Sequence, residues 1–403
     1  MIKLFSEVSS FFNKIVSQTK RYDTLLKLSA NNNKLTETIT VGSLAIRAMF
    51  DCDYDINTQT VSYGEFYKII SDLKKADNLE IVSSEGKLSI NGNDMVSNAS
   101  SSGDTIWTEL ETFDFDVFNK AIPINAVAAK SGYLDCNKYL FFLSENNKCH
   151  ILNTNDILLN DCKLDSSESF CFGINQEDCN VLKKFLAANS NKSINALDVK
   201  LFVNDTKTYV KFQMTSKNNV VYEMIIQSLF GERIEHLANV LLRLISTNWS
   251  GKEIQINEDL MRIDSITDSY TEYLANPKYS GKEKNQAKKL FKEFLDDKNL
   301  KDAYKKALKT FEVNFLNLSS SLGEDLYILR TLYESFKVAI SSHSTKSYLL
   351  DTKAKALVFE YEDEMFSFKS LFMLKVPVKE IVDLTDEEFE EEDDTPVEET
   401  IEN

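Results

Sequence analysis

Glycine, proline and histidine are scarce in this 403-residue chain, which has 11 glycines, 4 prolines and 3 histidines. The three histidines, His150, His236 and His343, are far apart and lie in no motif that pairs an imidazole with a nucleophile or a metal. The sequence contains no glycine-rich phosphate loop, no GxGxxG pattern after a strand, no HExxH and no nucleophile elbow. These absences argue against an enzyme, so we predict no catalytic residues, no metal and no cofactor.

The chain has six cysteines, but no two of them form a CxxC motif. The chain also opens without an apolar signal segment, which favours reduced thiols in a cytoplasmic protein. We interpret the adjacent Cys149 and His150 as a strand pair with one buried member, not as zinc ligands. No apolar run approaches the roughly 20 residues that cross a bilayer, so we expect a soluble protein without a membrane partner.

Acidic side chains outnumber basic ones by 63 to 46, but the excess is concentrated at the end of the chain. From Glu380 onward there are 13 acids and no bases, so residues 1–379 carry 50 acids and 46 bases. With Pro396 and few apolar residues, residues 377–403 are predicted to be a disordered acidic tail. The rest of the chain is rich in hydrophobic and aromatic residues and is long enough for two to four domains.

A unit of helix, strand, tight turn and strand occurs three times, at intervals of more than 100 residues. The three predicted helices span 63–75, 179–188 and 326–338. The strands that follow them span 79–83 and 87–91, 197–203 and 208–214, and 356–361 and 366–374. Each unit is preceded by another helix, predicted over 4–16, 124–134 and 233–245, with further strands over 24–28, 44–50, 139–143, 149–152 and 253–256.

This repetition predicts an α+β fold of three related domains, each with two helices packed on antiparallel sheets. We place the domains at 1–119, 120–231 and 232–376. The third departs from the repeat between 266 and 309, where the pattern becomes helical and carries ten lysines from Lys282 to Lys309. We interpret this segment as a helical insertion.

Three segments stand out: FYKIISDLKKADNLEIVSSEGKLSIN (66–91), ILNTNDILL (151–159) and KALVFEYEDEMFSFKSLFML (355–374). Together they resemble segments of the bacterial DNA polymerase sliding clamp family. Under this resemblance the helical insertion is open to three interpretations: a DNA-binding surface, a polymerase contact, or a solvated helical hairpin. The second segment is similar to the family's Ala-Thr-Asp-x-x-Arg-Leu turn, which Thr154 and Leu159 match. Asn155 stands in place of the aspartate and Leu158 in place of the arginine, so the resemblance does not extend to an ion pair at this turn.

The resemblance implies a ring that encircles duplex DNA, with the helices lining the hole and the sheets forming the outer wall. The helices would then carry cations toward the phosphates, which meet mobile lysine charges without sequence readout. The predicted DNA-facing residues are Lys14, Lys20, Arg21, Lys68, Lys74, Lys75, Lys130, Lys183, Lys184, Arg233, Arg243, Arg330 and Lys337.

The resemblance also implies a partner pocket near the last strand, formed by Thr154, Leu159, Leu371 and Met373, which would bind peptides of a DNA polymerase and a clamp loader. Three domains per chain favour a head-to-tail homodimer. A composition rich in Asn and Lys and poor in Pro suggests a bacteriophage source, and hence the cytoplasm of the bacterial host. The alternative is a structural or transcription-complex subunit of a large phage, in which the cations need not gather on the repeated helices.

Overall fold

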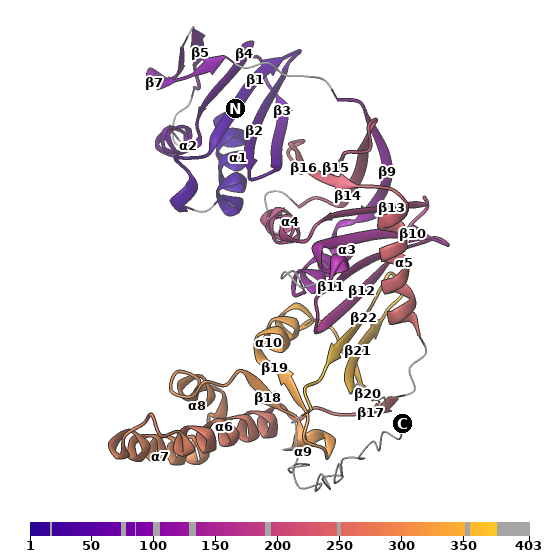
Figure 1. The fold of residues 1–403 in the computed structure, drawn as a ribbon. Helices are drawn as coiled ribbons and strands as arrows, with labels where there is room; N and C mark the ends of the chain where they lie inside the picture. Colours follow the sequence, from indigo (N-terminus) through magenta and orange to yellow (C-terminus); the bar gives the residue numbers. More distant parts are fainter. Residues whose placement is uncertain are drawn as a thin grey trace, which may run out of the picture.

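The computed structural model describes residues 1–16, 18–73, 78–84, 86–99, 105–128, 134–189, 195–247, 251–350 and 355–376. Figure 1 shows an arc in which antiparallel strands form one side and most of the helices lie on the other. No helix in these ranges is both long and apolar enough to cross a membrane.

Seventeen strands of the described ranges belong to one antiparallel sheet that extends along the arc in two runs. The first run, in spatial order, is β8 (Asn98–Ala99), β4 (Ile56–Ser62), β1 (Leu25–Asn31), β2 (Lys34–Val41), β3 (Leu44–Asp51), β16 (Val221–Leu229), β15 (Tyr209–Thr215), β14 (Asp198–Asn204) and β9 (Trp107–Asp114). The second is β13 (Phe170–Asn175), β10 (Tyr139–Glu145), β11 (Lys148–Thr154), β12 (Leu158–Asp165), β22 (Phe366–Met373), β21 (Ala356–Glu362), β20 (Lys346–Leu350) and β17 (Gly251–Glu253).

Two of the pairings in this sheet join strands that are especially far apart in the chain. In the first run β3 pairs with β16, and Arg47 lies opposite Glu223. In the second run β12 pairs with β22, and Leu159 lies opposite Leu371. Two smaller sheets stand apart: β5 (Ile81–Ser84), β6 (Lys87–Ile90) and β7 (Asn93–Val96), and β18 (Phe315–Asn317) with β19 (Tyr327–Leu329).

The inner side of the arc in Figure 1 carries, among others, α1 (Ile2–Ile15), α2 (Tyr63–Asp72), α3 (Phe115–Ala126), α4 (Gln176–Asn189) and α10 (Arg330–Ala339). Helix α5 (Glu232–Ser246) lies on the other side of the sheet. Successive side chains of β10 point to opposite faces of the sheet. Leu140 and Phe142 belong to the main core on one face, whereas Phe141 and Leu143 belong to a second core, which α5 shares, on the other.

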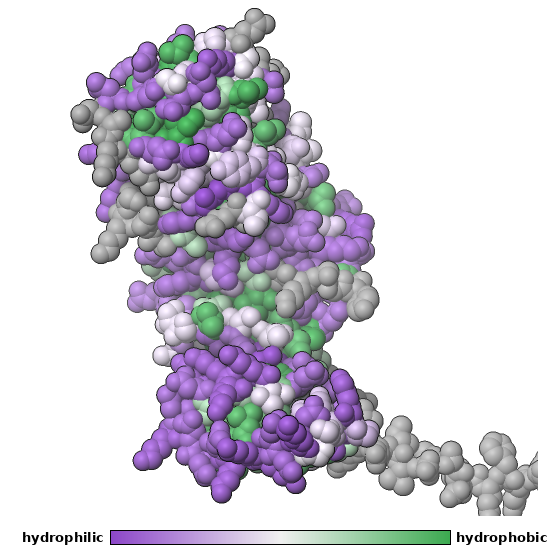
Figure 2. Space-filling model, turned by 90° about the vertical axis from the view of Figure 1, so that its left-hand side faces the viewer, coloured by the Kyte–Doolittle hydropathy of each residue, from purple (hydrophilic) through white to green (hydrophobic). Residues whose placement is uncertain are grey.

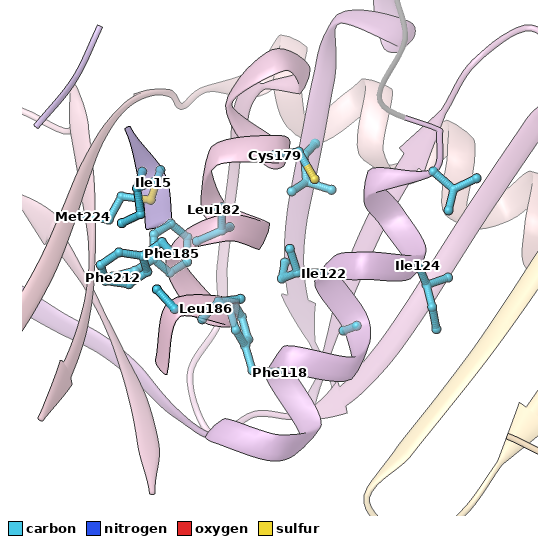
Figure 3. Close-up of a cluster of buried hydrophobic side chains, with 14 of the residues drawn as sticks. Ile15, Phe118, Ile122, Ile124, Cys179, Leu182, Phe185, Leu186, Phe212 and Met224 are labelled. Carbon is cyan, nitrogen blue, oxygen red and sulfur yellow. The ribbon is translucent and has the colours of Figure 1, made fainter. Parts of the chain in front are cut away.

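The main core joins α1, α3 and α4 to the strands beneath them. Figure 3 shows Leu182 and Phe185 of α4 beside Phe212 of β15, with Phe118 of α3 nearby. The Phe11 ring of α1 lies 5.6 Å from the Phe185 ring and 4.2 Å from the Tyr222 ring, measured between centroids. Burial of each such ring contributes about 1.5–3 kcal/mol, so these contacts hold α1 against α4 and β16.

Most predicted elements are confirmed to within a few residues, but the helix predicted over 124–134 is wrong. The helix is α3, which begins at Phe115 because the Asp114 carboxylate accepts a hydrogen bond from the Val117 N–H over 3.0 Å. It continues through Pro123, whose ring is tolerated inside it. The boundary predicted between residues 119 and 120 therefore falls within a helix.

Three other elements of the last third differ from the prediction. Residues 327–329 of the helix predicted over 326–338 form β19, and the strand predicted over 253–256 ends at Glu253 as β17. The insertion is helical, as predicted, and comprises α6 (Glu258–Ala275), α7 (Gly281–Asp296) and α8 (Leu300–Ala307), so it begins before residue 266. A short helix, α9 (Ser319–Leu322), follows it. The division into three domains stays a prediction.

Glu37 is an ionisable group buried in the core. Its side chain is fully buried on β2, and neither carboxylate oxygen has a hydrogen-bond partner among the described residues. Burial raises the pKa of Glu37 well above its ordinary value, since the charged form loses its hydration. The folded state therefore binds this proton more tightly than the unfolded state, and stability is lost as the pH rises from the ordinary carboxyl pKa through the raised one.

We expect Glu37→Gln to stabilise the protein at pH 7 by about 1–3 kcal/mol and to have little effect near pH 4. Glutamine has the shape and the neutral polarity of the protonated acid, so the comparison isolates the charge. Chemical denaturation of both proteins across this pH range measures the difference. A constant difference at every pH would contradict the assignment to ionisation of Glu37.

Candidate functional site

Most of the predicted cations that the structure describes belong to the helices α1, α2, α4 and α10, and Lys20 and Arg21 follow α1. Lys14, Lys20, Lys68, Lys183 and Lys184 are exposed, and Arg21, Arg330 and Lys337 are half-buried. Lys74, Lys75 and Lys130 lie outside the described residues.

Two of these cations also tie elements together. The Lys14 ammonium donates a hydrogen bond to the carbonyl of Ala188 in the last turn of α4, over 3.2 Å, where the helix dipole favours a cation. The Arg21 guanidinium lies 4.5 Å from the centre of the Tyr67 ring. Both side chains therefore have structural contacts besides any ligand they bind.

In α2, α3 and α4 acidic residues lie in the first turn and the lysines lie further along the helix. Glu65 lies in the first turn of α2, Asp116 in that of α3, and Glu177 and Asp178 in that of α4, where a negative charge is favoured by the helix dipole. The lysines of the same helices, Lys68, Lys120, Lys183 and Lys184, come later and are exposed. The cations thus gather along the middle of the helices and not at their acidic ends.

Lys120 was missed by the sequence analysis, because the predicted helix began at residue 124. It is an exposed residue of α3, and its charge acts on His343, just beyond α10. Burial, and after it the charge of Lys120, lowers the pKa of His343. Helix α3 packs against α10 at this point, where the middle and last thirds of the chain meet.

Arg233 and Arg243 do not lie with the other cations, so their predicted place on the same face is wrong. Both belong to α5, which packs on the opposite face of the sheet. Arg233 pairs with the Asp135 carboxylate over 2.6 Å, and Lys138, together with Arg233, lowers the pKa of Asp135. The sequence showed that α5 is amphipathic but not which sheet face would receive it.

The helix beside α10 on the inner side is α6 and not α5. Lys337 of α10 pairs with Glu258 of α6 over 3.0 Å, and Arg262 pairs with the same carboxylate over 3.1 Å. Figure 2 looks onto this side and shows mainly hydrophilic surface over the lower part, which α6, α7 and α8 form. Arg262 is therefore a candidate site residue that the predicted set lacked.

The four residues of the predicted partner pocket come together on the outer face. Thr154 lies opposite Leu159 between β11 and β12, and Leu159 lies opposite Leu371 between β12 and β22. Met373 is two residues further along β22, on the same face. The Thr154 hydroxyl donates to the carbonyl of Leu158 over 3.1 Å, so it fastens the turn.

Asn155 stabilises the turn between β11 and β12 through hydrogen bonds and not through an ion pair. Its side-chain oxygen accepts hydrogen bonds from the N–H groups of Ile157, over 2.9 Å, and Leu158, over 2.7 Å. This is the local turn geometry that asparagine and aspartate share. The replacement of a charged pair by Asn155 and Leu158 therefore leaves the β11–β12 connection in place.

Helix α5 covers part of the predicted pocket. Its residues Ile234, Ala238, Leu241 and Ile245 form the second core with eight sheet residues that include Leu159 and Leu371. Leu159 is 4% and Leu371 7% exposed, whereas Met373 is 38% exposed. The exposed part of the site is thus its Met373 end.

The contribution of α5 can be tested with two leucines of one helix. Leu241 is 4% exposed and Leu244 is 45% exposed. We expect Leu241→Ala to destabilise the protein by about 2–4 kcal/mol and Leu244→Ala by less than about 0.5 kcal/mol, because only the former leaves a cavity. Thermal and chemical unfolding measure both, and equal effects would show that α5 is not packed as described.

A cavity of about 680 Å³ adjoins the C-terminal end of α5 on the same outer face. His150 and Asp161 line it, and the His150 Nδ1 lies 2.9 Å from the Asp161 carboxylate. Cys149, the neighbour of His150 on β11, is fully buried, so the strand-pair interpretation of these two residues is confirmed.

No family model and no curated protein sequence matches the chain. Solved structures of bacterial sliding clamps do match its fold. The DNA polymerase III β subunit of Thermotoga maritima is 10% identical with a TM-score of 0.55, and the β chain of Streptococcus pneumoniae is 12% identical with a TM-score of 0.59. The DNA polymerase sliding clamp of Pseudomonas aeruginosa is 10% identical with a TM-score of 0.56. Each match covers 93% of this chain and 98% of the other. The chain therefore has the fold of bacterial sliding clamps.

Proposed function

We propose that the protein is a DNA sliding clamp, a ring that encircles duplex DNA and tethers a replicative polymerase. The observation that carries the proposal is the set of inner helices, paired as α1 with α2, α3 with α4, and α6 with α10, on one face of a continuous antiparallel sheet. The match to sliding clamps over 93% of the chain supports the same conclusion. No catalytic role is proposed for any residue.

The inner helices would contact the phosphates through lysine. Lys68, Lys120, Lys183 and Lys184 are exposed ammonium groups on flexible stems, and such point charges meet phosphates at many positions without a fixed geometry. Contacts of this kind are independent of sequence and individually weak, which permits movement along the duplex.

Polymerase and clamp-loader peptides would bind the outer face at Thr154 and Met373. In this proposal α5 forms one wall of the site, because its apolar side already fills the region of Leu159 and Leu371. A short apolar anchor could then contact Met373, which remains exposed.

Two chains would close the ring head to tail. The sheet of β5, β6 and β7 and the sheet of β18 and β19 stand apart from the large sheet, near opposite ends of the arc. A ring needs two different surfaces at the two ends of each subunit, which these small sheets and their surroundings supply.

Light scattering, combined with binding to circular and linearised duplex DNA in one buffer, tests the proposal. We expect a particle of twice the 46.0 kDa chain mass that stays on circles after loading and is lost from linear ends. A monomer without preference for circles would overturn the ring and favour the structural or transcription-complex alternative. The phage origin inferred from composition stays a prediction.

A further inference from the structure

A groove of about 650 Å³ lies between the insertion and α10. Its apolar lining comes from four elements: α6, the end of α8, β18 and α10. These residues are Met261, Tyr304, Leu308, Leu316, Tyr333 and Val338. Val338 is 76% exposed, which is unusual for a valine on a helix whose other side is packed in the core. The groove therefore offers an apolar surface to a ligand.

The rim of this groove is positively charged. Arg262, Lys301, Lys305 and Lys337 line it, against the two acids Glu258 and Glu334. Residues 281–309, to which Lys301 and Lys305 belong, contain ten lysines and five acids in all. An apolar floor within a cationic rim suits a peptide in which apolar and acidic residues are interspersed.

The chain itself contains such a peptide. Residues 381–389, IVDLTDEEF, have four apolar side chains and four acids, and they belong to the stretch with 13 acids and no bases. This segment has no use in the clamp function proposed above, whereas its charge is opposite to that of the insertion.

The described chain ends close enough to the groove for this segment to reach it. Lys375 pairs with Tyr327 of β19 through two backbone hydrogen bonds of 2.8 and 3.0 Å. The next strand is β18, in which Leu316 lines the groove. Two strand spacings are about 10 Å, and the five residue-to-residue steps from Val376 to Ile381 span up to about 17 Å.

We propose that residues 381–389 bind in this groove of their own chain, with apolar side chains over Tyr304, Tyr333 and Val338 and carboxylates facing Lys301 and Lys305. The local concentration of a tethered segment favours this occupant over a free peptide of the same composition. The groove is then an intramolecular docking site for the acidic tail.

Photo-crosslinking in the full-length chain tests this docking. With p-benzoylphenylalanine in place of Phe389, we expect crosslinks, mapped by mass spectrometry, to α8 and α10 within one chain, at a yield independent of protein concentration. Crosslinks between chains would assign the groove to a second copy and overturn the proposal, as would crosslinks confined to other surfaces.

Two groove variants and a matched control make the test specific. Val338→Glu and the double variant Lys301→Glu/Lys305→Glu change exposed residues and should lower the yield about tenfold, through loss of apolar contact and of charge attraction. Lys288→Glu/Lys292→Glu makes the same charge change on α7, away from the groove, and should lower it less than twofold. Equal loss in both double variants would overturn the specific site. A Lys301→Glu/Lys305→Glu variant that loses DNA binding but keeps the crosslink would assign the groove to DNA and likewise overturn it.

Discussion

Replacing Lys68, Lys120, Lys183 and Lys184 together with glutamine is expected to weaken binding to duplex DNA on the order of 10³-fold at 0.1 M salt. Each lysine that contacts a phosphate contributes about 0.9 to the slope of log affinity against log salt, so the slope should fall by about 3.6 for each chain of the proposed ring that contacts the duplex. Fluorescence anisotropy with a labelled duplex over a range of salt concentrations measures both quantities. All four lysines are exposed, so the variant should fold normally.

The matched control removes four positive charges from the opposite face of the sheet. Lys163, Lys346 and Lys369 line the outer cavity, and Lys148 lies on β11 and pairs with Asp165. Their replacement by glutamine changes the net charge equally, and we expect it to leave the salt slope nearly unchanged. If both variants lost the same affinity, net charge and not the inner face would govern binding.

Glu223→Ala is expected to destabilise the protein by about 3–5 kcal/mol, because it leaves a buried ammonium without its partner. The Lys211 ammonium lies 2.8 Å from the Glu223 carboxylate, 4.3 Å from the centre of the Phe202 ring and 5.0 Å from that of the Trp107 ring. Glu223 is 2% exposed and also pairs with Arg47 of β3 over 3.4 Å. The lost stability therefore comes from the pairing of β3 with β16, which joins distant parts of the chain.

Two further variants show whether an unpaired charge is the cause. The exposed pair of Lys148 and Asp165 provides the control, and Asp165→Ala should cost less than about 1 kcal/mol. Lys211→Met in the Glu223→Ala background removes the stranded charge and should recover much of the lost stability. Failure to recover it would show that Glu223 acts mainly through Arg47.

Much of the fold followed from local patterns. The alternation of strands and the helical spacing over residues 4–16, 179–188 and 356–374 predicted elements that the structure places at nearly the same residues. The repeat could be recognised in the sequence because each unit buries one side of a helix and one side of a strand pair. That burial requires apolar residues at helical and alternating spacing. The start of α3 was predicted too late, at residue 124, whereas the helix begins at Phe115 and contains Pro123.

The residues of the partner pocket were grouped by the family resemblance, because they come from three strands that are not all neighbours in the chain. Thr154, Leu159 and Leu371 come together through strand pairing, and a resemblance in three motifs was enough to group them with Met373. Lys120 and Arg262 were missed because α3 and α6 begin before residues 124 and 266, at which the helix and the insertion were predicted to begin. Whether a side chain belongs to the candidate surface depends on the exact ends of its helix. The periodicity of a sequence gives those ends only to within several residues.

The sequence by itself determined the repeated α+β units, the lysine-rich helical insertion and the separation of charge between the chain body and its end. Tertiary structure alone decided the face of the sheet on which α5 packs, the pairing of α6 with α10 and the groove between them. The physical reason is that an amphipathic pattern requires one side of a helix to be buried, whereas the partner surface depends on packing between residues far apart in the chain.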